Sequence, residues 1–218
     1  MMSDQLNCPS CGTVLKKSAF SNNELLSNIQ TQIVNEYTDD KKDQYCNKCG
    51  NHLYVNSKTL LINDIDRSSD KLSSYIGFIP LISIQNPPEW KYDILKIVTA
   101  QSVTGAGAFT EFAATFAELM GTQSNRYNNK IKGGENICFT QLRKNALDAG
   151  GNAVIGIDID YSEIGGDRGM IMVCMTGTAI HLTNIDILGE QVENIYKAQE
   201  LIQRIRYLLT LKTKAGIE

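Results

Sequence analysis

The chain has 218 residues, of which 42% are hydrophobic and 21% charged, and its formal net charge is −3. This composition is typical of a soluble globular protein with one domain or two modest ones, and it excludes a disordered chain. The small negative charge provides no whole-chain electrostatic case for binding nucleic acid. The sequence does not open with a signal-peptide pattern of basic residues followed by an apolar stretch. No apolar run approaches the roughly 20 residues that cross a bilayer. We therefore expect a cytoplasmic protein without a membrane segment.

Four of the six cysteines lie within the first 55 residues, in two copies of the pattern C-x-x-C-G. Cys8 and Cys11 form the first copy, and Cys46 and Cys49 form the second, with 34 residues between the copies. Each pattern can form a tight knuckle, in which the glycine after the second cysteine permits a positive φ. Four thiolates satisfy tetrahedral Zn²⁺ and leave no position open for water, so the pattern predicts a structural zinc site. Two unrelated thiol pairs or a redox C-x-x-C are the alternatives, although no βαβ context surrounds either pair.

Residues 1–55 resemble a zinc ribbon with a helix inserted between its knuckles. Residues 23–37 carry apolar side chains at helical spacing and are expected to form that helix. The segment is too small to fold on its own core, so metal ligation would supply much of its folding free energy. His52 follows Cys49 by three residues and could also reach an ion, but with four cysteines at hand we expect it on the surface.

Residues 56–77 are polar and rich in Ser and Asp, which predicts a linker. After the linker, hydrophobic periodicity predicts a mixture of strands and helices. In chain order these are strands over 77–85 and 93–103, helices over 108–120 and 135–149, strands over 153–161 and 170–181, and an amphipathic helix over 189–212. The pair Gly150 and Gly151 should end the second of these helices. Gly133 and Gly134 should delay its start to about Gly134, because each glycine costs about 1 kcal/mol inside a helix.

The predicted strand over 153–161 carries two aspartates, Asp158 and Asp160. Side chains alternate faces along a strand, so the odd-numbered, apolar residues from Ala153 to Tyr161 should face the helices and the aspartates the other side. The carboxylates could hold a hard metal ion, or form a ring of acids where several subunits meet. The simpler interpretation, which we favour, is that they are solvated or paired at the end of the strand.

Other candidate sites are weaker. Gly105 and Gly107 precede a predicted helix, but the third glycine of a dinucleotide fingerprint and the Lys-Ser/Thr of a P-loop are missing. We interpret them as a tight turn, with a small anion at the helix start as the alternative. Cys138 and Cys174 are expected to be small buried hydrophobes. No G-x-S-x-G or H-E-x-x-H motif occurs and the two histidines lie in unrelated contexts, so we expect no enzyme.

Residues 79–182 resemble the YbjQ-like family, small bacterial domains that bear a heavy-metal-binding label. The resemblance is carried by VTAQSVTGAGAFTEFAATFAELMGTQSNRY, by ICFTQL, and above all by DAGGNAVIGIDIDYSEIGG followed by RGMIMVCMTGTAIHL. It implies a compact α/β subunit that assembles into a ring, commonly a pentamer, and it implies no established activity.

Together these features predict an α+β protein in four parts. They are a four-cysteine zinc ribbon over 1–55, a linker over 56–77, a two-layer YbjQ-like oligomerisation domain with a mostly antiparallel sheet over 78–183, and a C-terminal amphipathic helix within 184–218. The leading functional hypothesis is a non-enzymatic, ring-forming scaffold whose zinc ribbon engages a partner protein. A metal sensor or buffer, and an unrecognised enzyme with a small-molecule site between subunits, are the alternatives.

Overall fold

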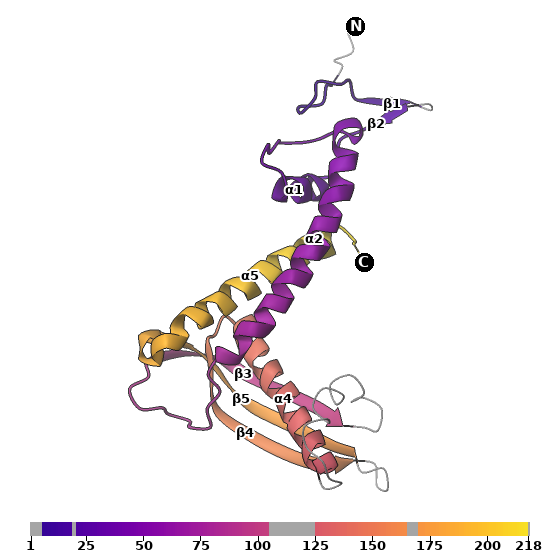
Figure 1. Ribbon diagram of the computed structural model, residues 1–218. Coiled ribbons are helices and arrows are strands. Elements are labelled where there is room, and N and C mark those ends of the chain that lie inside the picture. Colours follow the sequence, from indigo (N-terminus) through magenta and orange to yellow (C-terminus); the bar gives the residue numbers. More distant parts are fainter. Residues whose placement is uncertain (1–5, 19–20, 105–124, 165–169, 218) are drawn as a thin grey trace. The chain divides into compact units, whose positions relative to one another are not determined.

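The computed structural model describes residues 6–18, 21–104, 125–164 and 170–217. They form four α-helices and a three-stranded antiparallel sheet, together with a two-stranded hairpin near the N-terminus (Figure 1). The predicted α+β class is therefore confirmed. The chain divides into two compact units: unit one comprises residues 1–71 and 203–218, and unit two comprises residues 72–202. None of the described helices is both long enough and apolar enough to cross a bilayer.

Unit one begins with the hairpin of β1 (Lys16–Ser18) and β2 (Ser21–Asn23), followed by helix α1 (Asn28–Glu36). The predicted helix over 23–37 starts five residues late. Ser27 caps α1: its hydroxyl accepts the Gln30 N–H, and the Gln30 side chain accepts the Ser27 N–H in return. Such a reciprocal cap satisfies two otherwise unpaired donors and marks the start of a helix.

Helix α2 (Asn47–Tyr75) runs through most of the segment that was expected to be a linker, and that expectation is wrong. Ser57, Leu61, Ser68 and Leu72 are all buried, and their spacing of four, seven and four places them on one stripe of the helix. Two serines on the buried stripe make the sequence look polar. Neighbouring elements cover the stripe nonetheless, and tertiary packing of this kind overrides local composition.

The sheet of unit two contains β3 (Tyr92–Thr104), β4 (Ala153–Ile164) and β5 (Met170–Leu182) in the order β3-β5-β4. Helix α4 (Asn125–Asp148) lies across one face of it (Figure 1). The core between helix and sheet is made of apolar side chains from all four elements. They include Val98, Ala100, Cys138, Leu142, Ala146, Val154, Ile171, Val173, Met175 and Ala179. The strands predicted over 93–103, 153–161 and 170–181 are confirmed.

Helix α4 begins well before Gly134, so the expected late start is wrong. Gly134 is buried, four residues before the buried Cys138, and therefore lies on the stripe that faces the sheet. Ile131, a turn earlier, packs against the same core. This packing offsets the intrinsic cost of the glycines. The helix ends as predicted, because Gly150 has a φ of 84° and Gly151 N–H donates to Ala146 O at 2.8 Å.

Residues 77–85 do not form the regular strand that was expected. A 3₁₀-helix, η1 (Ile76–Phe78), opens the segment, and Leu81 then makes an isolated parallel bridge to Val154 at the edge of β4. Val154 N–H donates to Pro80 O, and Ile82 N–H donates to Val154 O. The proline has no N–H with which to continue a ladder.

The expected faces of β4 are wrong for Ala153 and Ile155, which lie on the side away from α4, and are confirmed for Ile157 and for Asp158 and Asp160. Gly156 has a φ of 62°, and the pairing of β4 with β5 shifts register between Ile155 and Asp158. This bulge adds a residue to one strand and changes the face on which the following side chains lie. Ala153 and Ile155 consequently pack on one side with Ile180, whereas Ile157 packs on the other side, against the core under α4.

Helix α5 (Val192–Lys214) follows a 3₁₀ segment, η3 (Ile185–Gln191). The amphipathic helix predicted over 189–212 is confirmed, with Ile195, Ile202 and Ile205 buried along one stripe. Leu208 and Leu211 are buried as well, whereas Leu209 is 43% exposed.

Candidate metal centre

The four cysteines of the two C-x-x-C-G patterns meet in unit one, and their sulfur atoms all lie within 4.8 Å of one another. The Sγ atoms of Cys8 and Cys49 are 3.8 Å apart, and those of Cys11 and Cys46 are 3.7 Å apart. A tetrahedron with metal–sulfur bonds of about 2.3 Å has edges of about 3.8 Å, so the donor set and its spacing fit Zn²⁺. Among the described residues, no other group of three or more His, Cys, Asp or Glu side chains comes together in this way.

The first knuckle is a tight loop closed by backbone hydrogen bonds. Cys8 N–H donates to Thr13 O at 2.8 Å, and Gly12 N–H donates to Cys8 O at 2.9 Å. Gly12 has a φ of 70°, which is the conformation the glycine was expected to permit. An isolated bridge between Asn7 and Val14 joins the two ends of the loop.

The second knuckle is the first turn of α2. Cys46 immediately precedes the helix, Cys49 lies in its first turn, and Gly50 N–H donates to Cys46 O at 2.7 Å. Gly50 is helical rather than left-handed, so the expected reason for this glycine is wrong. A Cβ here would lie 2.5 Å from Tyr45 Cβ and 2.7 Å from Leu26 Cδ1, so glycine is required by close packing.

The helical second knuckle directs backbone donors at a ligand. The backbone N–H groups of Cys49 and Lys48 favour the thiolate of Cys46 and lower its pKa. The first N–H groups of any helix lack intrahelical partners and favour negative charge, so the start of α2 is suited to a thiolate. The sequence pattern alone does not distinguish this arrangement from the second hairpin of a ribbon.

Asn23 joins the two knuckles and was not recognised from the sequence. Its side chain is buried; Nδ2 donates to Val14 O at 3.0 Å, and Oδ1 accepts the Lys48 N–H at 3.3 Å. One amide thus connects Val14, at the end of the first knuckle, to the helix that begins at the second. A buried amide with both ends paired fixes the relative position of the segments it joins. A lone Asn before a helical pattern carries no signal of this role.

The four thiols have unequal acidity in the absence of a cation. The hydrogen bond between the Cys11 sulfur and the Thr13 hydroxyl, 3.2 Å apart, lowers the pKa of the exposed Cys11 to about 6. Burial acts to raise the pKa of Cys46, but the N–H donors of α2 outweigh it and lower the pKa. Burial raises the pKa of Cys49 to about 12. Without a cation the cluster does not ionise as a whole, whereas a divalent ion would hold all four sulfurs as thiolates.

Asp158 and Asp160 do not form a comparable site. Both are exposed on the face of the sheet opposite α4, where they line a cavity of about 150 Å³ with Thr99, Gln101, Cys174 and Thr176. Asp160 Oδ1 accepts the N–H of Tyr161 at 2.9 Å. Neither carboxylate belongs to a group of three or more possible ligands within the described part of the chain.

The remaining candidates are resolved in part. Cys138 is buried with its sulfur 3.4 Å from Val173 O, and burial raises the pKa of its thiol, as expected of an inert core residue. Cys174 is only half-buried. His52 is exposed on α2 and lies outside the cysteine group, as expected. Gly105, Gly107 and the predicted helix over 108–120 lie outside the described residues.

Comparison with known proteins places most of unit two in a family. Residues 81–183 match the YbjQ family, which carries the description "Putative heavy-metal-binding". A UPF0145 protein from Clostridium botulinum (strain Alaska E43 / Type E3) is 33% identical over 102 residues, which are 47% of this chain and 92% of that protein. The chain belongs to the YbjQ-like family.

The family region and the cysteine group occupy different parts of this YbjQ-like protein. The match covers residues 81–183, whereas the four cysteines lie between positions 8 and 49. The crystal structure of a protein with unknown function from Pediococcus pentosaceus ATCC 25745 aligns with 47% of this chain and 95% of its own, at 17% identity and a TM-score of 0.32. The grouped metal ligands that the structure describes lie outside residues 81–183, the range of the family match.

Proposed function

We propose that this YbjQ-like protein is a non-enzymatic assembly protein with a structural zinc ion. Cys8, Cys11, Cys46 and Cys49 hold the ion, the YbjQ-like region associates with further copies of itself in a ring, and unit one engages a partner protein. The observation that carries the proposal is a set of exposed apolar side chains along β3, on the sheet face opposite α4. Ile94, Ile97 and Val103 of β3 lie there with 72%, 71% and 50% of their surface exposed.

A second copy of the chain is the occupant we propose for this face. Large apolar side chains exposed along one strand mark an interaction surface. The outer edge of β3 is already partly occupied, because Asn145 Nδ2 donates to Thr99 O and Gln141 Oε1 accepts the Gln101 N–H. The face is therefore more available than the edge. The family resemblance suggests a pentamer or a multiple of it, and several copies of unit one on one particle would bind a partner with avidity.

Mass measurement under native conditions tests the assembly. We expect a particle of several chains at micromolar concentration, which Ile97→Glu disrupts because it places a charge in the contact. The matched control is Ile137→Glu, which changes another exposed isoleucine, on α4, and should leave the particle intact. A wild-type protein that travels as single chains contradicts the proposal. Elemental analysis of the same material should find about one zinc per chain.

A metal sensor or buffer is the second candidate, and the exposure of Cys11 favours it. Cys8 and Cys46 are buried and Cys49 is half-buried, so Cys11 is the ligand at which a competing thiol or chelator can enter. This candidate predicts rapid exchange of the ion with a chelator. A second metal per chain that is lost in the Asp158→Asn, Asp160→Asn double variant would also support it.

A further inference from the structure

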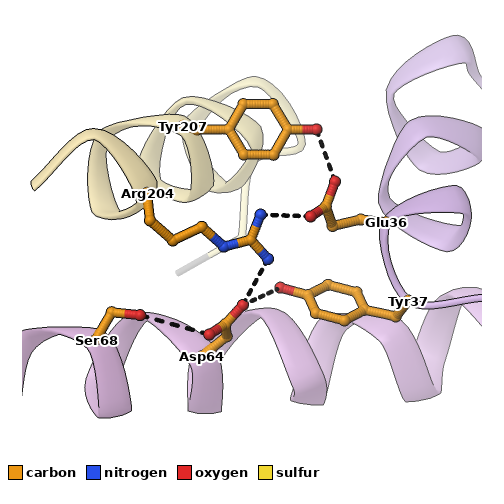
Figure 2. Close-up of polar contacts among 6 residues, drawn as sticks. All are labelled: Glu36, Tyr37, Asp64, Ser68, Arg204 and Tyr207. Atoms are coloured by element: carbon orange, nitrogen blue, oxygen red, sulfur yellow. Dashed lines mark hydrogen bonds and ion pairs between the residues drawn. The ribbon is translucent and has the colours of Figure 1, made fainter. Parts of the chain in front are cut away.

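Within unit one, the C-terminal end of α5 is held to α1 and α2 by a compact polar network (Figure 2). The Arg204 guanidinium contacts Glu36, the last residue of α1, and its Nη2 lies 2.7 Å from Asp64 Oδ2 on α2. The Tyr207 hydroxyl donates to the second oxygen of Glu36 at 2.8 Å. Burial opposes the charge of Arg204, but its hydrogen bonds to Asp64 and Glu36 outweigh that cost and raise its pKa. One residue of α5 thus joins α1 and α2.

An apolar cluster also joins the same three helices. Ile33 of α1, Leu61 of α2, and Leu208 and Leu211 of α5 are at most 2% exposed and pack together. The end of α5 therefore buries its apolar stripe against the two helices of unit one. Such burial is the main source of stability for a docked helix.

An adjacent face of α1 packs toward the metal centre. Val34, the neighbour of Ile33, forms a second cluster with Leu26 and Tyr45, and the ligand Cys49 packs against that cluster. Tyr54 of α2 contacts both clusters. Packed side chains thus run without a break from a cysteine ligand, across α1, to the end of α5.

The backbone that enters α1 is also tied to a ligand. Leu25 forms an antiparallel bridge with Cys46, and on either side of it Leu26 N–H donates to Tyr45 O and Asn47 N–H donates to Glu24 O. Helix α1 has nine residues, fewer than the roughly 12–15 that an isolated helix needs in water. Its order must therefore come from its contacts with the metal centre on one side and with α5 on the other.

The geometry points to α1 as a coupling element, through which metal binding at the four cysteines controls the docking of residues 203–214 of α5. An ion that fixes Cys46 and Cys49 fixes the entry and one face of α1. The other face of α1, with Glu36, then holds Arg204, Leu208 and their neighbours. The inference rests on the metal binding proposed above, and it is independent of the ring and of the partner. If metal binding stabilises the packing of α5 on α1 and α2, that packing must stabilise metal binding by the same free energy. A variant that weakens the packing of α5 must therefore weaken metal binding.

Zinc affinity of the full-length protein, measured by competition with a chromophoric chelator, tests the coupling. Leu208→Ala removes a fully buried side chain from the α5 dock without touching a ligand. Leu209→Ala makes the same change at the adjacent, 43% exposed position and is the matched control. We expect Leu208→Ala to weaken zinc binding about tenfold or more, within the usual range of coupling, and Leu209→Ala to change it less than about twofold. Equal affinities in the two variants overturn the inference.

Glu36→Gln is a milder variant in case Leu208→Ala fails to fold. It weakens the contacts of residue 36 with Arg204 and Tyr207. It also removes a negative charge from the C-terminal end of α1, which should stabilise that helix on its own. Coupling predicts weaker zinc binding, by about fivefold, whereas an effect confined to the stability of α1 predicts unchanged or tighter binding. A wild-type protein that binds no zinc refutes the proposed metal function. A zinc affinity that is the same in both variants as in the wild-type protein refutes only the coupling.

Limited trypsin digestion provides the reverse measurement. In the zinc-loaded protein, cleavage after Arg204 should be slow because its guanidinium is engaged by two carboxylates. Chelation of the zinc should accelerate cleavage between residues 203 and 214 about tenfold. Cleavage that is equally fast with and without zinc contradicts the inference.

Discussion

Replacing Gly50 by alanine should destabilise the protein, contrary to the usual effect of this change inside a helix. In an unconstrained helix, Gly→Ala is favourable by about 1 kcal/mol. At Gly50 the new Cβ would lie 2.5 Å from Tyr45 Cβ, an atom fixed to the backbone, and 2.7 Å from Leu26 Cδ1 in the cluster beside Cys49. Real Cβ contacts essentially never fall below 3.0 Å, so a segment next to a ligand must move.

The size of the effect follows from these two terms. Overpacking a well-packed core costs about 1–3 kcal/mol, and a clash with two neighbours, one of them close to the backbone, belongs in the upper part of that range. After subtraction of the helix-propensity gain, the free energy of unfolding should fall by about 1–2 kcal/mol. Zinc binding should weaken as well, because the shifted atoms support the second knuckle.

Chemical denaturation of the zinc-loaded protein, followed by circular dichroism, measures the change. Asn51→Ala is the control, since Asn51 is the next residue of the same helix turn and is exposed, so it receives alanine without a clash. We expect the control to be neutral or slightly stabilised. If Gly50→Ala proves as stable as Asn51→Ala, the close-packing explanation for Gly50 is wrong.

Two further predictions concern the thiols and the sheet. In metal-free protein, iodoacetamide should alkylate the exposed Cys11 before Cys49, because a pKa of about 6 leaves Cys11 as thiolate at pH 7 and a pKa of about 12 leaves Cys49 protonated. As the pH is lowered, the alkylation rate of Cys11 should fall to half its maximum near pH 6. Equal alkylation rates at Cys11 and Cys49, measured by mass spectrometry, would contradict this order. Asn152→Ala should lower the free energy of unfolding by about 2–4 kcal/mol, because the buried side-chain amide hydrogen-bonds both the N–H and the carbonyl oxygen of Leu182. Thermal unfolding measures the change, and a variant of unchanged stability would show that water replaces the amide.

The linear sequence was informative wherever a short pattern carries its own chemistry. The spacing of Cys8, Cys11, Cys46 and Cys49 predicted which side chains gather, because a C-x-x-C loop brings two thiols to one point wherever it lies. Gly150 and Gly151 marked the end of α4 because few other residues adopt the left-handed conformation there. The strands of unit two followed from their apolar periodicity. In each case the cause lies within a few residues of its effect.

Tertiary structure decided what local patterns leave open. The buried serines of α2 became core positions only because other elements cover them, and the bulge at Gly156 moved the aspartates relative to Ile155 through pairing with a strand from later in the chain. The partners of Arg204 lie 140 and 168 residues away, so no spacing in the sequence could indicate them. Ligand identity is a local property of residue type and spacing, whereas the contacts that tie α1 to both the cysteines and α5 exist only after distant segments have packed.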